Sequence, residues 1–422
     1  MFIVYNVLMT VLAPFWVPWM LLRARRRGEQ PKWSERTGDY EFQPLKDSKR
    51  VWIHAVSVGE VVAATPILKA LRNLLPDYEI VLSVTTSSGH HMARDHAVDL
   101  YDHLVYFPID VPRFQLAAMQ HVQPSVVAIM ETELWLNFLW AAKIFDAKTL
   151  LINGRISDRS FARSRKLKTY YRAILEKLDR ALMQSERDAE KIRELGATNV
   201  EVLGNAKIDQ AVEGLQADPE EWRRELDLPA EKPVIVIGST RGEEEERFVL
   251  SALKLVGLEN ITVIHAPRHL ERVPELVKLL KEAGVQPALR SQGKGGQYVI
   301  LDTYGELDEV YSVADVVIIG GGFADLGGQN LLQPLAHGKP VLHGPHMQNF
   351  REAADEADRS GGAQSVSTPE DLAQALLQLI DDPGERASRG RAARELIQKS
   401  TGASKRYAQA IADEAKKFQR TA

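Results

Sequence analysis

The chain has 422 residues, of which 45% are hydrophobic and 26% charged, and it carries a net charge of −4 with no cysteine. This length gives room for two or three globular domains, and the acidic balance argues against a general nucleic-acid-binding protein. Without cysteine the chain forms no disulfides, thiolate metal sites or cysteine nucleophile, which fits a reducing compartment.

The first segment has the composition of a membrane anchor. Met1–Leu22 contains no charged residue, is about long enough to cross a bilayer as a helix, and includes Trp16 and Trp19, which suit membrane interfaces. Its two prolines leave a shallow interfacial helix open, and a buried core helix is a further alternative. Four arginines follow within residues 23–27 and keep the rest of the chain in the cytoplasm by the positive-inside rule. We therefore expect an anchor at the inner membrane in residues 1–27.

After the anchor, two series of short apolar runs alternate with helical patterns, which predicts parallel sheets of the βαβ type. The predicted strands of the first series are Val51–His54, Ile80–Val84, Leu104–Phe107, Val126–Met130, Thr149–Asn153, Ala181–Gln184 and Val200–Leu203. Those of the second are Val234–Ile237, Ile261–His265, Tyr298–Asp302, Val316–Ile319 and Val341–Leu342.

The two series predict two domains of the α/β class. We expect Rossmann-like domains at residues 28–210 and 211–402, joined through a polar segment, and a C-terminal helix in 403–422 that packs back on the first domain. This is the outline of a GT-B glycosyltransferase, and sugar-nucleotide 2-epimerases have the same outline.

The most informative turn of the first domain is His54-Ala-Val-Ser-Val-Gly59-Glu60, between the first strand and a helix. Such turns open at the carboxyl edge of a parallel sheet, where ligands bind. Glu60 lies near a helix N-terminus, where its charged form is favoured, so it is either a proton acceptor or a helix cap.

Two further strand ends of this domain carry charged side chains. Met130-Glu131-Thr-Glu133 follows one strand, and Asn205-Ala-Lys207 follows another. Two acids and a lysine at one edge would suit removal of a proton from an alcohol and stabilisation of charge at a reacting centre.

The second domain offers a phosphate site. Gly320–Gly322 follows a strand and Gly327-Gly-Gln-Asn330 precedes a helical run, so backbone N–H groups could meet a phosphate, which Arg268 could also clamp. The histidines form no spaced metal-binding motif, so we expect no metal.

Together, these residues resemble the motif set of bacterial 3-deoxy-D-manno-octulosonic acid (Kdo) transferases. The motifs that carry the resemblance are His54–Glu60, Glu131–Trp135, Gly204–Lys207, Pro267-Arg268, Gly305-Glu306, Gly327–Asn330, and Gly344–His346 with Asn349-Phe350, in matching order from the anchor to about residue 400.

The resemblance implies a membrane-anchored, inverting GT-B enzyme without metal or other cofactor. Its donor would be CMP-Kdo, and its acceptor a lipid A precursor at the membrane lipid, in lipopolysaccharide core synthesis. Glu60 would be the general base, with Glu131 and Lys207 assisting the transition state. CMP would be bound by Pro267, Arg268, Tyr304, Gly305, Glu306, Asn330, Leu331, Leu332 and Gln333.

The chain departs from the family pattern at two places. Gln333 stands where the family has Glu, an acid that related enzymes use to hold ribose hydroxyls; Gln333 keeps one acceptor oxygen but loses the charge. Arg241-Gly242 stands where the family tends to have His-Glu. A sugar-nucleotide epimerase and a membrane scaffold without donor binding are the alternatives.

A basic run in the first domain predicts a second contact with the membrane. It contains Arg155, Arg159, Arg163, Arg165, Lys166, Lys168 and Arg172. Each cation near an anionic surface contributes about 1 kcal/mol, so a few suffice to orient the domain; the alternative is a solvated basic surface.

Overall fold

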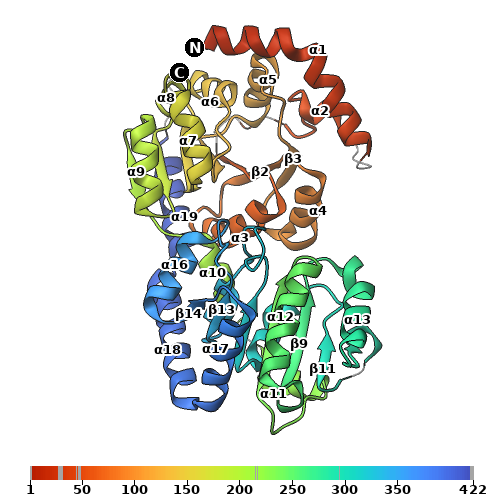
Figure 1. Ribbon diagram of the computed structural model, residues 1–422. Helices are drawn as coiled ribbons and strands as arrows, with labels where there is room; N and C mark the ends of the chain where they lie inside the picture. Colours follow the sequence, from red (N-terminus) through yellow and green to blue (C-terminus); the bar gives the residue numbers. More distant parts are fainter. Residues whose placement is uncertain are drawn as a thin grey trace. The chain divides into compact units, whose positions relative to one another are not determined.

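The computed structural model of the protein describes residues 2–26, 32–43, 45, 49–213, 215, 217–293 and 295–418. The chain divides into two compact units, one of residues 1–210 and 401–422 and the other of residues 211–400. Each unit contains a seven-stranded sheet in which all strand pairs are parallel (Figure 1). The chain is thus α/β with two parallel sheets.

The sheet of the first unit has the strand order β3-β2-β1-β4-β5-β6-β7. The strands are β1 (Arg50–His54), β2 (Glu79–Val84), β3 (His103–Tyr106), β4 (Val126–Met130), β5 (Lys148–Gly154), β6 (Arg180–Met183) and β7 (Val200–Val202). The order reverses between β1 and β4, because β1 pairs with β2 on one side and with β4 on the other. Such a switch point leaves a crevice at the carboxyl ends of the two strands.

Helices cover both faces of this sheet. They are α2 (Trp33–Arg36), α3 (Val58–Leu74), α4 (Ser87–His96), α5 (Pro112–Val122), α6 (Leu136–Ile144), α7 (Asp158–Lys166), α8 (Lys168–Leu175), α9 (Glu186–Leu195), α10 (Ala206–Glu213) and α19 (Ala403–Lys417). Alternate residues of β1 enter different cores: Val51 and Ile53 pack with α3 and α19, and Trp52 packs with α5 and α6. The C-terminal helix therefore completes the first unit.

The N-terminal helix α1 (Phe2–Arg26) lies against the first unit through polar side chains. The Tyr5 hydroxyl donates to Asp110 at 2.8 Å, and Asn6 and Asn137 exchange amide hydrogen bonds at 2.9 and 2.8 Å. Phe2 and Trp140 also contact each other, with ring centroids 4.6 Å apart.

Within the described residues, no helix combines the length and apolar character needed to cross a bilayer. The expected N-terminal membrane anchor, for which a spanning and an interfacial helix were both open, is therefore not supported. The first turns of α1 carry hydrogen-bonding side chains that contact other parts of the first unit. The side chains of Trp16, Trp19 and the arginine cluster lie outside the described residues.

The sheet of the second unit has the order β10-β11-β9-β8-β12-β13-β14. The strands are β8 (Val234–Thr240), β9 (Thr262–Pro267), β10 (Ala288–Leu289), β11 (Tyr298–Ile300), β12 (Val316–Ile319), β13 (Val341–His343) and β14 (Ala363–Ser365). The α-helices are α11 (Pro219–Glu225), α12 (Glu243–Val256), α13 (Val273–Glu282), α14 (Leu307–Val310), α15 (Leu332–Ala336), α16 (Arg351–Ser360), α17 (Pro369–Asp381) and α18 (Pro383–Ser400). The switch point of this sheet lies between β8 and β12.

All twelve predicted strands occur, most within one or two residues of their predicted bounds. The edge strands β10 and β14 were not predicted, because two or three residues are too short to show a periodic pattern. The observed division of the chain falls at 210/211 and at 400/401, beside the expected 210/211 and 402/403.

Candidate active site

The candidate catalytic residues of the first unit lie at the switch point of its sheet. Glu60 is in the first turn of α3, directly after β1, and Glu131 follows the last residue of β4, the strand next to β1. Lys207 lies near the start of α10, after β7 at the edge of the sheet, yet its Nζ is 2.8 Å from Glu131 Oε1. The structure therefore brings the Glu131 and Lys207 side chains into direct contact.

Glu60 is held by the turn that precedes its helix. Its Oε2 accepts the Val56 N–H at 2.8 Å and its Oε1 accepts the Ser57 hydroxyl at 3.2 Å. These contacts fit the helix-capping interpretation, but the side chain is also buried. His54, which opens the motif, is fully buried, stacks on Phe107, and burial lowers its pKa to about 3, so it is a neutral support for the turn.

Burial and the neighbouring charges at this edge raise the pKa of Glu60, so that it takes up a proton near neutral pH. Burial raises the pKa of Glu60 to about 7 against the opposing effect of the Val56 N–H, and the neighbouring Glu131 and Glu133 charges raise it further. Burial also raises the pKa of Glu133. A buried carboxylate with a pKa close to the working pH is the state that a general base needs.

Two residues of this cluster were not among the predicted site residues. Arg155 approaches the second oxygen of Glu131, with Nε 3.7 Å from Oε2, although the sequence analysis placed it in the membrane-facing run. Asn153 accepts the Ala206 N–H on its Oδ1 at 3.1 Å. Both lie at the end of β5, the strand beside β4. Their position at a predicted strand end is the sequence feature that could have identified them as site residues.

The predicted donor residues of the second unit lie on loops at the carboxyl edge of its sheet. Pro267 ends β9 and Arg268 follows it, residues 304–306 follow β11, and residues 330–333 follow β12 through a long loop. Arg268 and Tyr304 are exposed, and the Asn330 side chain accepts the N–H of Leu332, the first residue of α15, at 3.0 Å. Gln333 is half-buried.

Several of these residues are placed so that only their backbone could meet a ligand. The side chains of Pro267, Leu331 and Leu332 are buried. The Glu306 carboxylate is already engaged by Arg290, whose Nη2 lies at 3.0 Å, and by the Thr303 hydroxyl. Arg290 also pairs with Glu225 of α11, so it connects that helix to the 302–306 loop; nothing in its sequence context indicated this.

The first glycine cluster is not a free phosphate site, which corrects the prediction for Gly320–Gly322. The fully buried Glu245 carboxylate accepts the N–H groups of Gly321 at 2.7 Å and Phe323 at 3.0 Å. A Cβ on Gly320 would lie 2.6 Å from Thr240 Cα, and one on Gly322 would lie 3.2 Å from Gly344 O. These glycines serve close packing of loops, and an internal carboxylate already accepts the N–H groups of Gly321 and Phe323.

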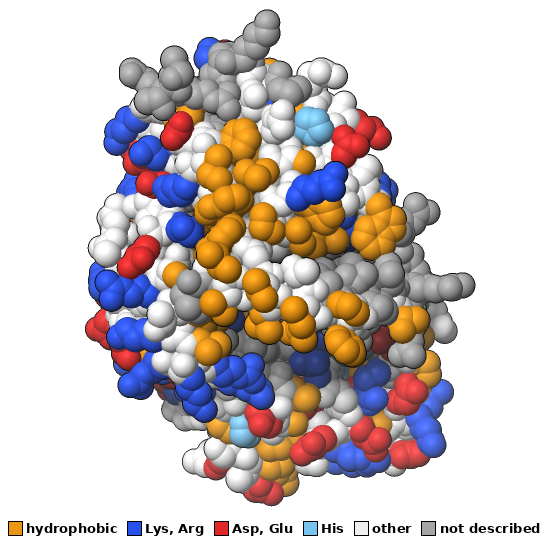
Figure 2. Space-filling view, turned by 90° about the horizontal axis from the view of Figure 1, so that it is seen from above, with side chains coloured by type: hydrophobic (Ala, Val, Ile, Leu, Met, Phe, Trp, Pro, Cys, Tyr) orange, Lys and Arg blue, Asp and Glu red, His pale blue; other side chains and the backbone are white. Residues whose placement is uncertain are grey.

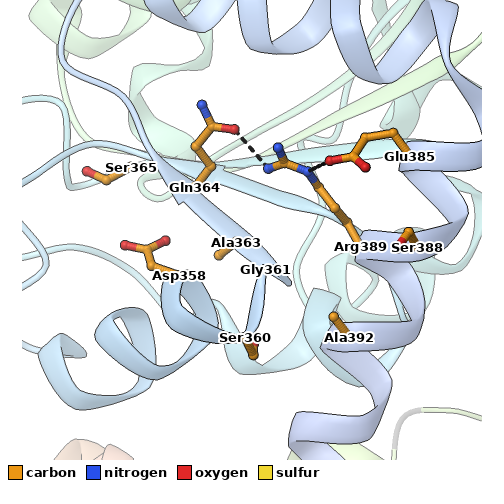
Figure 3. A pocket seen from close by; sticks show the side chains of 10 residues that line it. All are labelled: Asp358, Ser360, Gly361, Ala363, Gln364, Ser365, Glu385, Ser388, Arg389 and Ala392. Carbon is orange, nitrogen blue, oxygen red and sulfur yellow. Dashed lines mark hydrogen bonds and ion pairs between the residues drawn. The ribbon is translucent and has the colours of Figure 1, made fainter.

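The second unit also has a pocket of about 470 Å³ between α16, β14 and α18 (Figure 3). Arg389 is directed across it, but Glu385 and Gln364 both bond its guanidinium at 2.8 Å. None of the predicted donor residues lines this pocket. In the described part of the chain no group of three or more His, Cys, Asp or Glu side chains could hold a metal ion.

Comparisons with known proteins agree with the motifs. The family described as 3-deoxy-D-manno-octulosonic-acid transferase matches residues 31–210. A 3-deoxy-D-manno-octulosonic acid transferase of Bordetella pertussis is 33% identical over 97% of this chain and 98% of its own length. A bifunctional glycosyltransferase/methyltransferase of Fusobacterium nucleatum is also 33% identical, over 80% of this chain, which spans only 53% of that longer protein.

A glycosyltransferase structure from Rickettsia africae shares the fold, with a TM-score of 0.63 and 14% identity over 90% of this chain and 100% of that one. The sequence relatives confirm the resemblance seen in the motifs. The chain belongs to the 3-deoxy-D-manno-octulosonic acid transferases, a family of glycosyltransferases.

Proposed function

We propose that the protein transfers Kdo from CMP-Kdo to a hydroxyl group of a lipid A precursor, with inversion, in lipopolysaccharide core synthesis. The observation that carries the proposal is the buried Glu60, with a pKa raised to about 7, at the switch point of the first sheet and under the influence of Glu131. A glycosyl transfer to an alcohol needs such a base.

In the proposed reaction, Glu60 takes the proton of the acceptor hydroxyl as its oxygen forms a bond to the anomeric carbon of Kdo. The bond between that carbon and the CMP phosphate oxygen breaks, and CMP leaves with the bonding electrons. Lys207, oriented by Glu131 at 2.8 Å, is suited to stabilise the negative charge that develops as CMP leaves with the bonding electrons. Attack on the face opposite CMP inverts the configuration.

The donor is assigned to the second unit. Arg268 is exposed, and no hydrogen bond or ion pair of its side chain occurs with the residues that the structure describes, so it is available for a phosphate oxygen. Tyr304 and Gly305 present an exposed loop next to it, because β11 and β9 are neighbours.

We also propose that α1 is an interfacial anchor that lies on the cytoplasmic surface of the inner membrane. Its exposed apolar side chains are Ile3, Val4, Val7, Leu8, Val11, Leu12, Phe15 and Leu22. The surface seen from above carries a broad area of hydrophobic side chains bordered by Lys and Arg (Figure 2). An apolar helix surface beside cations is suited to an anionic bilayer surface.

The basic run next to α1 contributes fewer free cations than the sequence suggests. Tyr5 of α1 contacts Tyr170 of α8, with ring centroids 5.7 Å apart, so the run is close to the helix. Arg165 pairs with Glu194 at 3.0 Å and Arg172 with Glu176 at 2.8 Å. The exposed cations for which the described residues provide no partner are Arg159, Arg163, Lys166 and Lys168.

A transfer assay tests the activity. Purified protein is incubated with CMP-Kdo and a lipid A precursor, and the lipid mass and released CMP are measured, with Glu60→Gln as the matched inactive control. A lipid that gains Kdo in step with CMP release supports the proposal. CMP-Kdo consumed equally without acceptor would indicate an epimerase-type reaction, and CMP neither bound nor released would indicate a scaffold.

Sedimentation with anionic vesicles tests the membrane contact. Replacing Arg159, Arg163, Lys166 and Lys168 by Ser is expected to weaken binding of the full chain by roughly 10²–10³-fold, because each cation contributes about 1 kcal/mol, and to reduce its salt dependence. The matched control replaces Lys278, Lys281, Arg391 and Lys399, exposed cations of the second unit. If both variants bind the vesicles equally well, the basic run makes no contact with the membrane. Any remaining binding would then have to come from α1.

A further inference from the structure

The Asn153 side chain bonds the start of the helix that carries Lys207, one half of the Lys207–Glu131 ion pair. The side chain is fully buried at the end of β5, and its Oδ1 accepts the Ala206 N–H at 3.1 Å. Since a backbone N–H can only donate, the atom that it meets must be the amide oxygen, which fixes the orientation of the Asn153 side chain. Ala206 is the first residue of α10, and Lys207 follows it.

The same end of β5 also holds the partner of Lys207. The Glu131 N–H donates to Ile152 O at 3.0 Å, one residue before Asn153. Glu131 and Asn153 both have left-handed backbones, with φ of 54° and 49°. Two neighbouring strands thus end in a conformation that most side chains disfavour, and such outliers concentrate at functional sites.

The choice of Asn at position 153 follows from these two demands. Asn tolerates the left-handed region better than most residues, and its side chain supplies the acceptor that α10 needs; Gly would supply only the first property. The remaining group, Nδ2, is buried with no hydrogen-bond partner among the described residues. A buried polar group with an unmet donor is unfavourable, so its presence calls for a compensating role.

We propose that Asn153 is a positioning residue for the transfer reaction, which holds the start of α10 so that Lys207 stays on Glu131. This inference rests on the proposed function, because it acts on the same site. Asn153 touches neither substrate. It works through the position of one cation relative to one carboxylate.

A displacement of Lys207 would change the pKa of Glu60, the proposed base, through the charge of Glu131. Glu60 faces the Glu131 and Glu133 carboxylates, both of which raise its pKa, and Glu131 in turn faces the cations Lys207 and Arg155. If Lys207 moves away, Glu131 is neutralised less, and its charge disfavours the carboxylate form of Glu60 more strongly. The pKa of Glu60 then rises further.

The test is Asn153→Gly, which keeps the left-handed backbone and removes only the side chain. We expect kcat to fall roughly 10-fold or more, since small displacements of catalytic groups have such effects, with little change in the KM for CMP-Kdo. The acid limb of the kcat/KM profile should move to higher pH. Gln123→Gly is the matched control: Gln123 also has a left-handed backbone, with φ of 46°, and follows α5. It should leave kcat and the pH profile unchanged.

A double-mutant cycle separates positioning from a general structural role. In a Lys207→Met background, Asn153→Gly should have almost no further effect on kcat, because the residue through which it acts is gone. Additive effects, together with an unmoved acid limb, would overturn the proposal.

The proposal can also be tested without turnover. Unfolding of the wild type and of Glu60→Gln is followed against pH, and the same comparison is then made between Asn153→Gly and the Asn153→Gly, Glu60→Gln double variant. Within each pair, the difference between the two stability curves grows from about pH 4.5, the ordinary pKa of Glu60, and the pH at which it stops growing reports the pKa of Glu60 in the folded protein. A shift of this pH upward in the pair that carries Asn153→Gly supports the proposal even if the transfer assay fails, and no shift overturns it.

Discussion

Both sheets carry candidate site residues at their carboxyl edges, but the surroundings of these residues differ. In the first unit the charged side chains are already bonded within the protein, and we call this the prepared edge; in the second unit they stand exposed on loops, and we call this the open edge. At the edge of the first unit, charged side chains hold one another: Lys207 contacts Glu131, and Glu60 is bound by its own turn. At the edge of the second unit, the exposed Arg268 and Tyr304 stand on loops. The buried carboxylate there, Glu245, holds backbone N–H groups.

The difference indicates which of the proposed steps, binding or catalysis, needs side chains that are in place before the substrate binds. A base and its charged neighbours act only if their positions and pKa values are set before the substrate arrives, so they are bonded to each other. A nucleotide site can form its contacts when the nucleotide binds, provided that hydrogen bonds within the protein hold the surrounding loops in place. Glu245 and Arg290 give support of this kind, because each bonds a loop at this edge of the sheet.

The strongest test of the prepared edge is Glu60→Gln. We expect turnover to fall roughly 10²–10⁴-fold, because Gln cannot accept a proton, while CMP binding stays the same. In the wild type, kcat/KM should fall as pH decreases through about 7, where Glu60 becomes protonated. Steady-state kinetics across pH and calorimetry with CMP check both points. Near-normal turnover of the variant would reduce Glu60 to a helix cap.

The open edge is tested by Arg268→Ala. Loss of a charge-assisted hydrogen bond to the CMP phosphate should weaken CMP binding by about 1.5–3 kcal/mol. Since the Arg268 side chain is exposed, its removal should leave the melting temperature unchanged. Calorimetry and thermal unfolding provide the two measurements, and Arg247→Ala on the exposed surface of α12 is a matched control. Unaltered CMP affinity would move the nucleotide site elsewhere.

The buried Glu60 carboxylate should also lower the free energy of unfolding above about pH 7. A second measurement on Glu60→Gln tests this. The folded pKa of Glu60, about 7, lies above its ordinary value of 4.5. Its protonated form therefore stabilises the fold fully below pH 4.5, and this contribution is lost as pH rises through 7. Compared with the wild type, the Gln variant should gain on the order of 3 kcal/mol in free energy of unfolding between about pH 4 and about pH 8. A difference that is constant with pH would contradict the raised pKa.

Most of the fold could be predicted because both series of strands are Val- and Ile-rich runs, buried on both faces and separated by helical patterns. Glu60, Glu131 and Arg268 lie close after the ends of such runs, so their sheet edges could be predicted too. Contacts across several strands could not be predicted: Lys207 meets Glu131 from an element whose start is bonded by Asn153 of another strand. The prediction for Gly320–Gly322 was wrong because the spacing of the glycines does not show that Glu245 accepts the Gly321 N–H.

The docking of α1 escaped prediction for a related reason. An uncharged stretch indicates an apolar environment, but it does not show that Tyr5 and Asn6 meet polar partners more than a hundred residues away. Local composition therefore suggested a membrane-spanning helix, whereas long-range hydrogen bonds decide where the first turns of the helix lie.

The smallest effect is expected where the chain departs from its family. Gln333 follows the Asn330 turn in α15 and is half-buried, with one amide oxygen available as an acceptor for a ribose hydroxyl. A carboxylate at this position would accept the same hydrogen bond with full charge, so Gln333→Glu should leave CMP affinity equal or make it a few-fold tighter. Gln333→Leu is the matched control, since it keeps a side chain of similar size without an acceptor and should bind CMP more weakly. Calorimetry with CMP and with cytidine separates the ribose contact from the phosphate contact. If Glu weakened binding of both ligands while Leu had no effect, Gln333 would not face the ribose, and the open edge would hold the nucleotide through Arg268 and the 304–306 loop alone.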